Sequence, residues 1–246
     1  MVDSPWYVEA FRGDYPTVYP HRDQVSARRE VEWILSLGFG GRLLDLCCGF
    51  GRHSVALAEA GCDVLGIDLS MELLMQARGL EAGELVAGSL LRADARFLPL
   101  AAGACDGVLN LFSSFGYFGD DGDELVAREV KRVLKPGGRA LFDLMNPARI
   151  RAGLVPHSET ERDGLRILET RSLEQGGRRV VKQVDIERAD GARRSWREDV
   201  RLYDPSEIEA LLSRVGLGVE AVWGTFGDTP FGPDSQRQVV VARHLA

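Results

Sequence analysis

Short apolar runs alternate with helical segments from residue 41 to residue 145, and this alternation constrains the fold most strongly. The run 41–47 (GRLLDLC) ends in a glycine turn, after which 53–61 (HSVALAEAG) places apolar residues at helical spacing and stops at a glycine. The same order repeats, predicting strands at 41–47, 62–68, 88–94, 105–112 and 139–145 and helices at 53–61, 71–79 and 123–134. Strands separated by helices predict a parallel sheet that helices cover on both faces.

The alternation of strands and helices stops after Pro147. Strand-like runs at 165–174, 178–189 and 193–203 are separated by Gly176-Gly177 and by Asp190-Gly191, a hairpin signal. A helix at 205–216, a strand at 218–223, a glycine- and proline-rich loop at 224–234 and a strand at 237–245 are predicted to follow. The predicted organisation is an N-terminal helical cap (1–40), a core (41–150 and 204–246) and an antiparallel β insert (151–203).

Composition and charge narrow the class of protein. The 246 residues are 45% hydrophobic and 27% charged, which is typical of a soluble globular protein. No apolar run approaches the ~20 residues of a membrane span and no secretion signal is present, so a cytoplasmic protein with no membrane contact is expected. The net charge of −7 disfavours a nucleic-acid partner. Monomer and homodimer both stay open.

Polar residues follow four successive predicted strands, where a parallel sheet binds its ligands. Gly49 and Gly51 follow the first strand, Asp68 the second, Asp94 the third, and Asn110 lies in the fourth. Glycines let backbone N–H groups approach a ligand, and an acid about 20 residues after the turn accepts hydrogen bonds from ribose hydroxyls. Each alone has a structural reading, as a tight turn, a helix cap or a loop acid. Together they predict an adenosine pocket.

The stretches LLDLCCGFGRHSVALAEAGCDVLGIDLS, LRADARFLPL, CDGVLNLFSSFGYF and VLKPGGRALFDLMNP resemble, in order, the motifs of class I S-adenosylmethionine (SAM)-dependent methyltransferases that act on small molecules. The resemblance covers residues 40–146 closely. It implies a doubly wound, mostly parallel seven-stranded α/β sheet with a small antiparallel β insert, SAM as cofactor and S-adenosyl-L-homocysteine as product. The family's usual turn is Asp-x-Gly-x-Gly-x-Gly, and Cys47 stands where its first glycine would be.

The resemblance also implies roles for individual residues. Asp45 and the backbone of 46–51 hold the methionine end of SAM, Asp68 holds the ribose, and Asn110 lies near the reacting sulfonium. The full set of predicted cofactor contacts is Tyr19, Asp45, Leu46, Cys47, Gly49, Gly51, Asp68, Leu69, Asp94, Ala95 and Asn110. Of these, Leu69 packs on adenine, Asp94 and Ala95 meet its amine and ring nitrogen, and Tyr19 belongs to an N-terminal segment that closes over SAM.

The acceptor is expected beside the aromatic residues that follow the fourth strand. Phe112, Phe115, Tyr117 and Phe118 lie there, and Ser113, Phe115 and Tyr117 are the substrate candidates. Methyl transfer is an in-line displacement that depends chiefly on alignment, so no catalytic residue is assigned. The Asn/Asp-Pro-Pro-Tyr/Phe pattern of amino-methylating DNA and protein-glutamine enzymes is absent. The predicted partner is therefore a small molecule methylated on N or O, with the insert and the 224–237 loop as a possible lid.

Other functions stay open at this point. They are a methyltransferase acting on RNA or protein, a non-catalytic SAM-binding module and, less favoured, an NAD-dependent oxidoreductase, whose glycine turn is similar. Residue 54 is serine where the oxidoreductase fingerprint has its third glycine. Cys47 and Cys48 lack the separated pairs of a metal or redox site, so they are interpreted as small residues of the turn and no metal is predicted.

Overall fold

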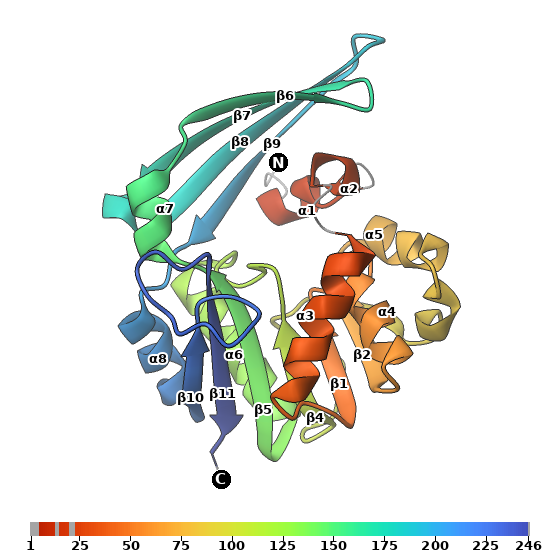
Figure 1. The fold of residues 1–246 in the computed structure, drawn as a ribbon, viewed down its shortest axis with the longest axis vertical. Coiled ribbons are helices and arrows are strands. Elements are labelled where there is room, and N and C mark those ends of the chain that lie inside the picture. The colour runs from red at the N-terminus through yellow and green to blue at the C-terminus, as the bar shows by residue number, and fades with distance from the viewer. Residues whose placement is uncertain (1–4, 13–14, 20–22, 246) are drawn as a thin grey trace.

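The computed structural model describes residues 5–12, 15–19 and 23–245, which form a seven-stranded and a four-stranded sheet (Figure 1). The strands are β1 (Arg42–Leu46), β2 (Asp63–Asp68), β3 (Leu90–Arg92), β4 (Cys105–Asn110), β5 (Leu134–Met145), β6 (His157–Arg162), β7 (Leu165–Glu174), β8 (Arg179–Arg188), β9 (Arg193–Arg201), β10 (Leu217–Trp223) and β11 (Arg237–His244). The α-helices are α1 (Trp6–Ala10), α2 (Tyr15–Val18), α3 (Gln24–Ser36), α4 (Arg52–Glu59), α5 (Met71–Gln76), α6 (Gly119–Val133), α7 (Pro147–Gly153) and α8 (Pro205–Arg214).

The seven-stranded sheet has the order β10-β11-β5-β4-β1-β2-β3. β1 pairs in parallel with both β2 and β4, β4 pairs in parallel with β5, and β11 is antiparallel to both β5 and β10. The predicted doubly wound, mostly parallel sheet is confirmed. The chain order reverses between β1 and β4, so the carboxyl ends of these two strands flank the crevice in which such sheets bind ligands.

Helices cover both faces of this sheet because strand residues alternate in direction. Leu44 and Leu46 of β1 pack in one buried cluster with residues of α6 and α8. Leu43 packs in the other with α3 and α4, which lie together in front of the sheet in Figure 1. In the described part of the chain, no helix is both long and apolar enough to cross a bilayer.

The four-stranded antiparallel sheet, β6-β7-β8-β9, covers the N-terminal helices α1 and α2 (Figure 1). Val184 of β8 lies opposite Trp196 of β9 in the register. Both side chains are buried in one cluster with Ala10 of α1 and Tyr15 of α2. The N-terminal segment is thereby held between the insert and the sheet that carries the glycine turn.

Three elements differ from the sequence prediction. β6 is a fourth strand of the insert, and its sequence HSETER has no apolar alternation because it is an exposed edge strand that contributes mainly backbone pairing. α7 was not predicted, although Asn146 caps it and Pro147 occupies its first turn. β5 begins at Leu134, ahead of the Pro136-Gly137-Gly138 turn after which the strand was expected.

Candidate functional site

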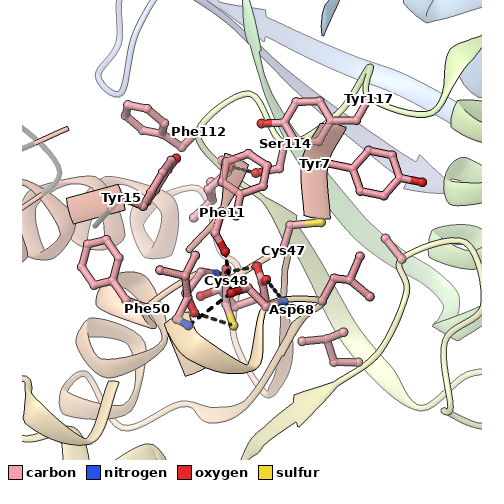
Figure 2. A pocket seen from close by; sticks show the side chains of 18 of the residues that line it. Tyr7, Phe11, Tyr15, Cys47, Cys48, Phe50, Asp68, Phe112, Ser114 and Tyr117 are labelled. Carbon is pink, nitrogen blue, oxygen red and sulfur yellow. Dashed lines mark hydrogen bonds between the residues drawn. The ribbon is translucent and has the colours of Figure 1, made fainter. Parts of the chain in front are cut away.

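A pocket lies at the carboxyl ends of β1, β2 and β4, beneath the N-terminal helices (Figure 2). Its floor includes Asp45, Cys47 and Gly49 from β1 and the turn after it, and Asp68 from the end of β2. The other side of the pocket carries aromatic rings from the N-terminal segment and from the loop after β4. Residues 93–95, after β3, also line it, so the fold brings five separated segments of the chain to one cavity.

The glycine turn has three residues in the left-handed backbone region. Cys47 has φ 62°, Gly49 has φ 58° and Gly51, the N-cap of α4, has φ 76°. A left-handed conformation costs a residue with a Cβ roughly 1–2 kcal/mol, which explains why glycine is usual at the position of Cys47. A Cβ on Gly51 would lie 3.0 Å from the Cβ of Ala77, so this glycine also permits close packing.

Asp45 and Asp68 are buried acids on the floor of the pocket. Asp45 Oδ2 accepts a hydrogen bond from Ser54 Oγ at 2.6 Å, while its Oδ1 is buried without a partner among the described residues. Asp68 accepts from the backbone N–H groups of Gly49 and Ser70, both at 2.8 Å. Burial raises the pKa of both carboxyls. A ligand that donates hydrogen bonds or carries positive charge would therefore stabilise the ionised form of both carboxyls.

Asp94 lies at the edge of the same pocket in a different setting. Its two oxygens accept from the Arg96 side chain at 3.0 and 2.7 Å, and Oδ1 also accepts from the Arg96 backbone. The hydrogen bonds from the Arg96 side chain lower the pKa of this carboxyl. Asp94 stays ionised at neutral pH, and its remaining lone pairs face a pocket that Ala95 also lines.

Aromatic side chains form the opposite side of the pocket (Figure 2). Tyr7, Phe11 and Tyr15 come from the N-terminal segment, and Phe112 and Tyr117 come from the loop after β4. Phe11 stacks on Tyr117 with ring centroids 5.7 Å apart and an interplanar angle of 18°. The N-terminal rings were not predicted from the sequence, although aromatic residues at 7, 11 and 15 repeat every four positions, the spacing of one helix face.

An ion pair between the buried Asp143 and the partly buried Arg237 holds the loop after β4. Phe112 and Ser113 both have left-handed φ values, 60° and 58°, without being glycine. Asp143 Oδ2 accepts from the N–H of Phe112 at 2.8 Å, and its Oδ1 accepts from Arg237 Nε at 2.6 Å. Arg237 also donates to Ser113 Oγ at 2.8 Å. These bonds fix the strained backbone that presents the Phe112 ring to the pocket.

The structure brings together most, but not all, of the predicted site residues. The pocket is lined by Asp45, Cys47, Gly49, Asp68, Leu69, Asp94, Ala95 and, among the substrate candidates, Tyr117. Outside its lining are Tyr19, Leu46, Gly51, Asn110, Ser113 and Phe115. For these six residues, the direct contacts with SAM or with the acceptor that the resemblance implies stay predictions.

The residues outside the lining have identifiable partners. Leu46 and Phe115 are core side chains, and Phe115 packs against the rings of Phe142 and Tyr203. Asn110 is buried and donates to the carbonyl of Leu46 at 3.2 Å. The Tyr19 hydroxyl donates to Glu198 and accepts from Lys182 on the inner face of the insert. The direction of each of these side chains is therefore set by partners distant in sequence, which its position at a strand end does not reveal.

The four cysteines are free thiols. Burial raises the pKa of both Cys47 and Cys48 well above the usual range, so both stay protonated at neutral pH. Among the described residues no group of His, Cys, Asp and Glu side chains is arranged to hold a metal ion. The paired cysteines are therefore small neutral residues of the pocket floor.

Comparison with known proteins identifies the same region. A model of a methyltransferase domain matches residues 43–138. The chain is 38% identical over 134 residues to the putative methyltransferase YqeM of Bacillus subtilis (strain 168), a match that spans 52% of each chain, about half the length of that relative. It is 29% identical over 222 residues to the cypemycin N-terminal methyltransferase of a Streptomyces species, covering 86% of this chain and 87% of the relative.

A solved structure extends the likeness to the whole fold. The sugar N-methyltransferase KedS8 from Streptoalloteichus sp ATCC 53650 superposes with a TM-score of 0.74, covering 100% of this chain and 98% of KedS8 at 22% identity. The sheet order, the glycine turn followed by Asp68, and the matched domain agree with one another. Residues 43–138 are therefore a methyltransferase domain, and the chain as a whole has the fold of the S-adenosylmethionine-dependent methyltransferases.

Proposed function

We propose that this protein transfers the methyl group of SAM to an amine nitrogen of a small molecule. The observation that carries the proposal is a single pocket with buried acids on its floor and aromatic rings on its other side. Two of the similar proteins support an amine acceptor by their names, one an N-terminal methyltransferase and the other a sugar N-methyltransferase.

The floor of the pocket fits SAM chemically. The unpartnered Oδ1 of Asp45 is an acceptor for the ammonium group of the methionine end, and Gly49 leaves its side of the turn open. Asp68 keeps lone pairs for the ribose hydroxyls, because a carboxylate has about four acceptor sites and the N–H groups of Gly49 and Ser70 occupy one on each oxygen. Leu69 and Ala95 supply apolar contacts for the adenine ring. Bound there, SAM supplies a methyl group activated by its sulfonium.

The chain's own contribution is alignment and the exclusion of water. Holding two reactants in line removes roughly 7–11 kcal/mol of the barrier. The N-terminal rings close the pocket from the side of the insert, since α1 and α2 pack beneath the four-stranded sheet. Aromatic faces also attract a cationic sulfonium or amine by roughly 0.5–2 kcal/mol each. We propose that residues 1–40 and the insert (151–203) together act as this cover.

The same lining favours an amine over a hydroxyl acceptor. An alcohol needs a general base to become a good nucleophile, whereas an amine needs only to arrive unprotonated. The described lining includes one imidazole, that of His53, and its Nε2 lies 2.5 Å from Glu30 Oε2. With Nε2 held by Glu30, Nδ1 is left as the one ring nitrogen that could serve a hydroxyl acceptor as base, whereas an amine that arrives unprotonated needs no base at all.

Ligand-induced thermal stabilisation tests the cofactor. SAM and S-adenosyl-L-homocysteine (SAH) should each raise the unfolding temperature, because a ligand at 100 times its dissociation constant adds about 2.7 kcal/mol to the free energy of unfolding. NAD and NADP serve as matched nucleotide controls and should leave the unfolding temperature unchanged. Stabilisation by NAD without any by SAH contradicts the proposal.

The acceptor is tested with methyl-labelled SAM and a panel of small amines, each paired with the alcohol that replaces its nitrogen by oxygen. We expect label and SAH formation with amines only, read by mass spectrometry of the product. Total RNA and a set of peptides complete the panel. Label entering only alcohols, RNA or peptides refutes the small-molecule amine while leaving methyl transfer itself intact.

A further inference from the structure

Arg52 is a buried cation that faces the pocket with an unsatisfied donor. It is the first residue of α4, directly after the left-handed Gly51, and it is 4% exposed. Its Nη1 lies 3.3 Å from Glu30 Oε2 and 3.5 Å from the carbonyl oxygen of Asp23. Its Nη2 is buried and has no hydrogen-bond partner among the residues that the structure describes. Buried N–H donors of charged groups are rarely left unpaired, so this nitrogen indicates a ligand atom.

The neighbouring contacts fix where the guanidinium points. Its carbon lies 5.3 Å from the centroid of the Phe112 ring, which lines the same pocket. Glu30 is shared between Arg52 and His53. Burial opposes the charge of Glu30, but the hydrogen bond from His53 and the charge of Arg52 outweigh it and lower the pKa of that carboxyl. The guanidinium is therefore anchored by Nη1 and the ring, which leaves Nη2 for an incoming group.

A second unsatisfied atom of opposite charge lies on the same floor. Asp45 Oδ1 is buried and finds no hydrogen-bond partner in the part of the chain that the structure describes, while Oδ2 of that carboxylate is held by Ser54. Asp45 and Arg52 both line the pocket, at the two ends of the glycine turn. A free carboxylate oxygen and a free guanidinium nitrogen are complementary to the ammonium and carboxylate of one α-amino acid.

We propose that Arg52 binds the carboxylate of the amino-acid end of SAM, while Asp45 takes its ammonium group. The assignment rests on the proposed function. It adds a positively charged partner for the carboxylate of SAM, which the turn residues 46–51 can contact only through backbone N–H groups. A carboxylate on the acceptor is the other source of the same chemistry. The location of Arg52 in the glycine turn, with Asp45 at its other end, favours the cofactor.

The test compares two ligands that differ only in the carboxylate. SAH and decarboxylated SAH are titrated calorimetrically into the full chain, as wild type, Arg52→Met and Arg52→Lys. The wild type should prefer SAH, and Arg52→Met should reduce this preference roughly 10- to 100-fold, the loss expected for a charge-assisted hydrogen bond. Arg214→Met, an exposed arginine of α8, is the matched control and should keep the full preference.

The ratio of the affinities for SAH and decarboxylated SAH distinguishes a carboxylate contact of Arg52 from a purely structural role. Equal weakening of both ligands by Arg52→Met indicates a purely structural role and overturns the assignment. Unchanged affinities for both ligands overturn it as well, and are the result expected if Arg52 binds a carboxylate of the acceptor. If Arg52→Met does not fold, Arg52→Lys decides, since its single ammonium should lower the ratio at least threefold. Failure of the wild type to bind either nucleoside instead refutes the proposed function itself.

Discussion

Asp123 of α6 connects the pocket to the end of the insert through a buried carboxylate. Its side chain is fully buried, and it accepts from the N–H of Phe118 at 3.1 Å and from the hydroxyl of Tyr203 at 2.8 Å. Burial raises the pKa of Asp123 to about 6, although both hydrogen bonds work in the other direction. The folded protein therefore holds the Asp123 proton more tightly than the unfolded chain does.

Ionisation of Asp123 lowers the free energy of unfolding as the pH rises. Below about pH 3 the carboxyl is protonated in both states, so its ionisation does not affect stability. Above about pH 7 it is ionised in both states, and the folded protein bears the full cost of the buried charge. A rise in pKa from 3.8 to about 6, at about 1.4 kcal/mol per pH unit, makes that cost about 3 kcal/mol.

Asp123→Asn removes the charge and keeps the geometry. The amide oxygen still accepts from Phe118, and the amide nitrogen donates to the Tyr203 hydroxyl oxygen. The free energy of unfolding of the variant, minus that of the wild type, should increase by roughly 2–2.5 kcal/mol between pH 4 and pH 7.5. Urea unfolding followed by far-UV circular dichroism at several pH values measures this difference.

Tyr203→Phe is the control, because it removes a donor that lowers the pKa of Asp123. In this variant the pH-dependent loss of stability should extend to higher pH than in the wild type. A difference between Asp123→Asn and wild type that stays constant from pH 4 to pH 7.5 would refute the reasoning.

Three further substitutions test the turn and the core. Asp68→Ala should abolish stabilisation by SAH in a thermal-shift assay while the chain stays folded, and an unchanged SAH affinity would remove Asp68 from the ribose role. Cys47→Gly should change the free energy of unfolding by less than about 1 kcal/mol, because relief of the left-handed strain offsets the entropy cost of glycine; a tenfold loss of SAH affinity would show that the thiol does more than fit. Phe142→Ala should lower the free energy of unfolding by about 3–5 kcal/mol in urea titrations, and a loss below 1 kcal/mol would contradict its place in the core.

The parallel sheet and much of the pocket floor could be predicted because their signals are local. β1, the glycine turn and α4 are adjacent in sequence, and the short apolar run of each strand and the 3.6-residue period of each helix are visible within a dozen residues. The polar residues that follow β1, β2 and β3 converge in any parallel sheet, because the carboxyl ends of its strands share one edge. Asp45, Asp68 and Asp94 were therefore predicted together, and they line one pocket.

Long-range contacts decided the rest. The polar strand β6 exists only because β7 offers it a backbone partner, which no periodicity within HSETER reveals. Tyr19 meets Lys182 and Glu198, about 160 and 180 residues further along the chain, so its partner depends on how the insert folds back.

The sequence by itself determined the fold class, the glycine turn and the acids at the strand ends. Only the tertiary structure placed the rings of Tyr7 and Phe11 over that turn. It also left Arg52 and Asp45 each with one buried atom that has no hydrogen-bond partner among the residues described. The physical reason is that burial and hydrogen-bond satisfaction are properties of the whole packed chain. A residue's type and spacing give its capacity to bind, and its three-dimensional surroundings decide whether that capacity is already used.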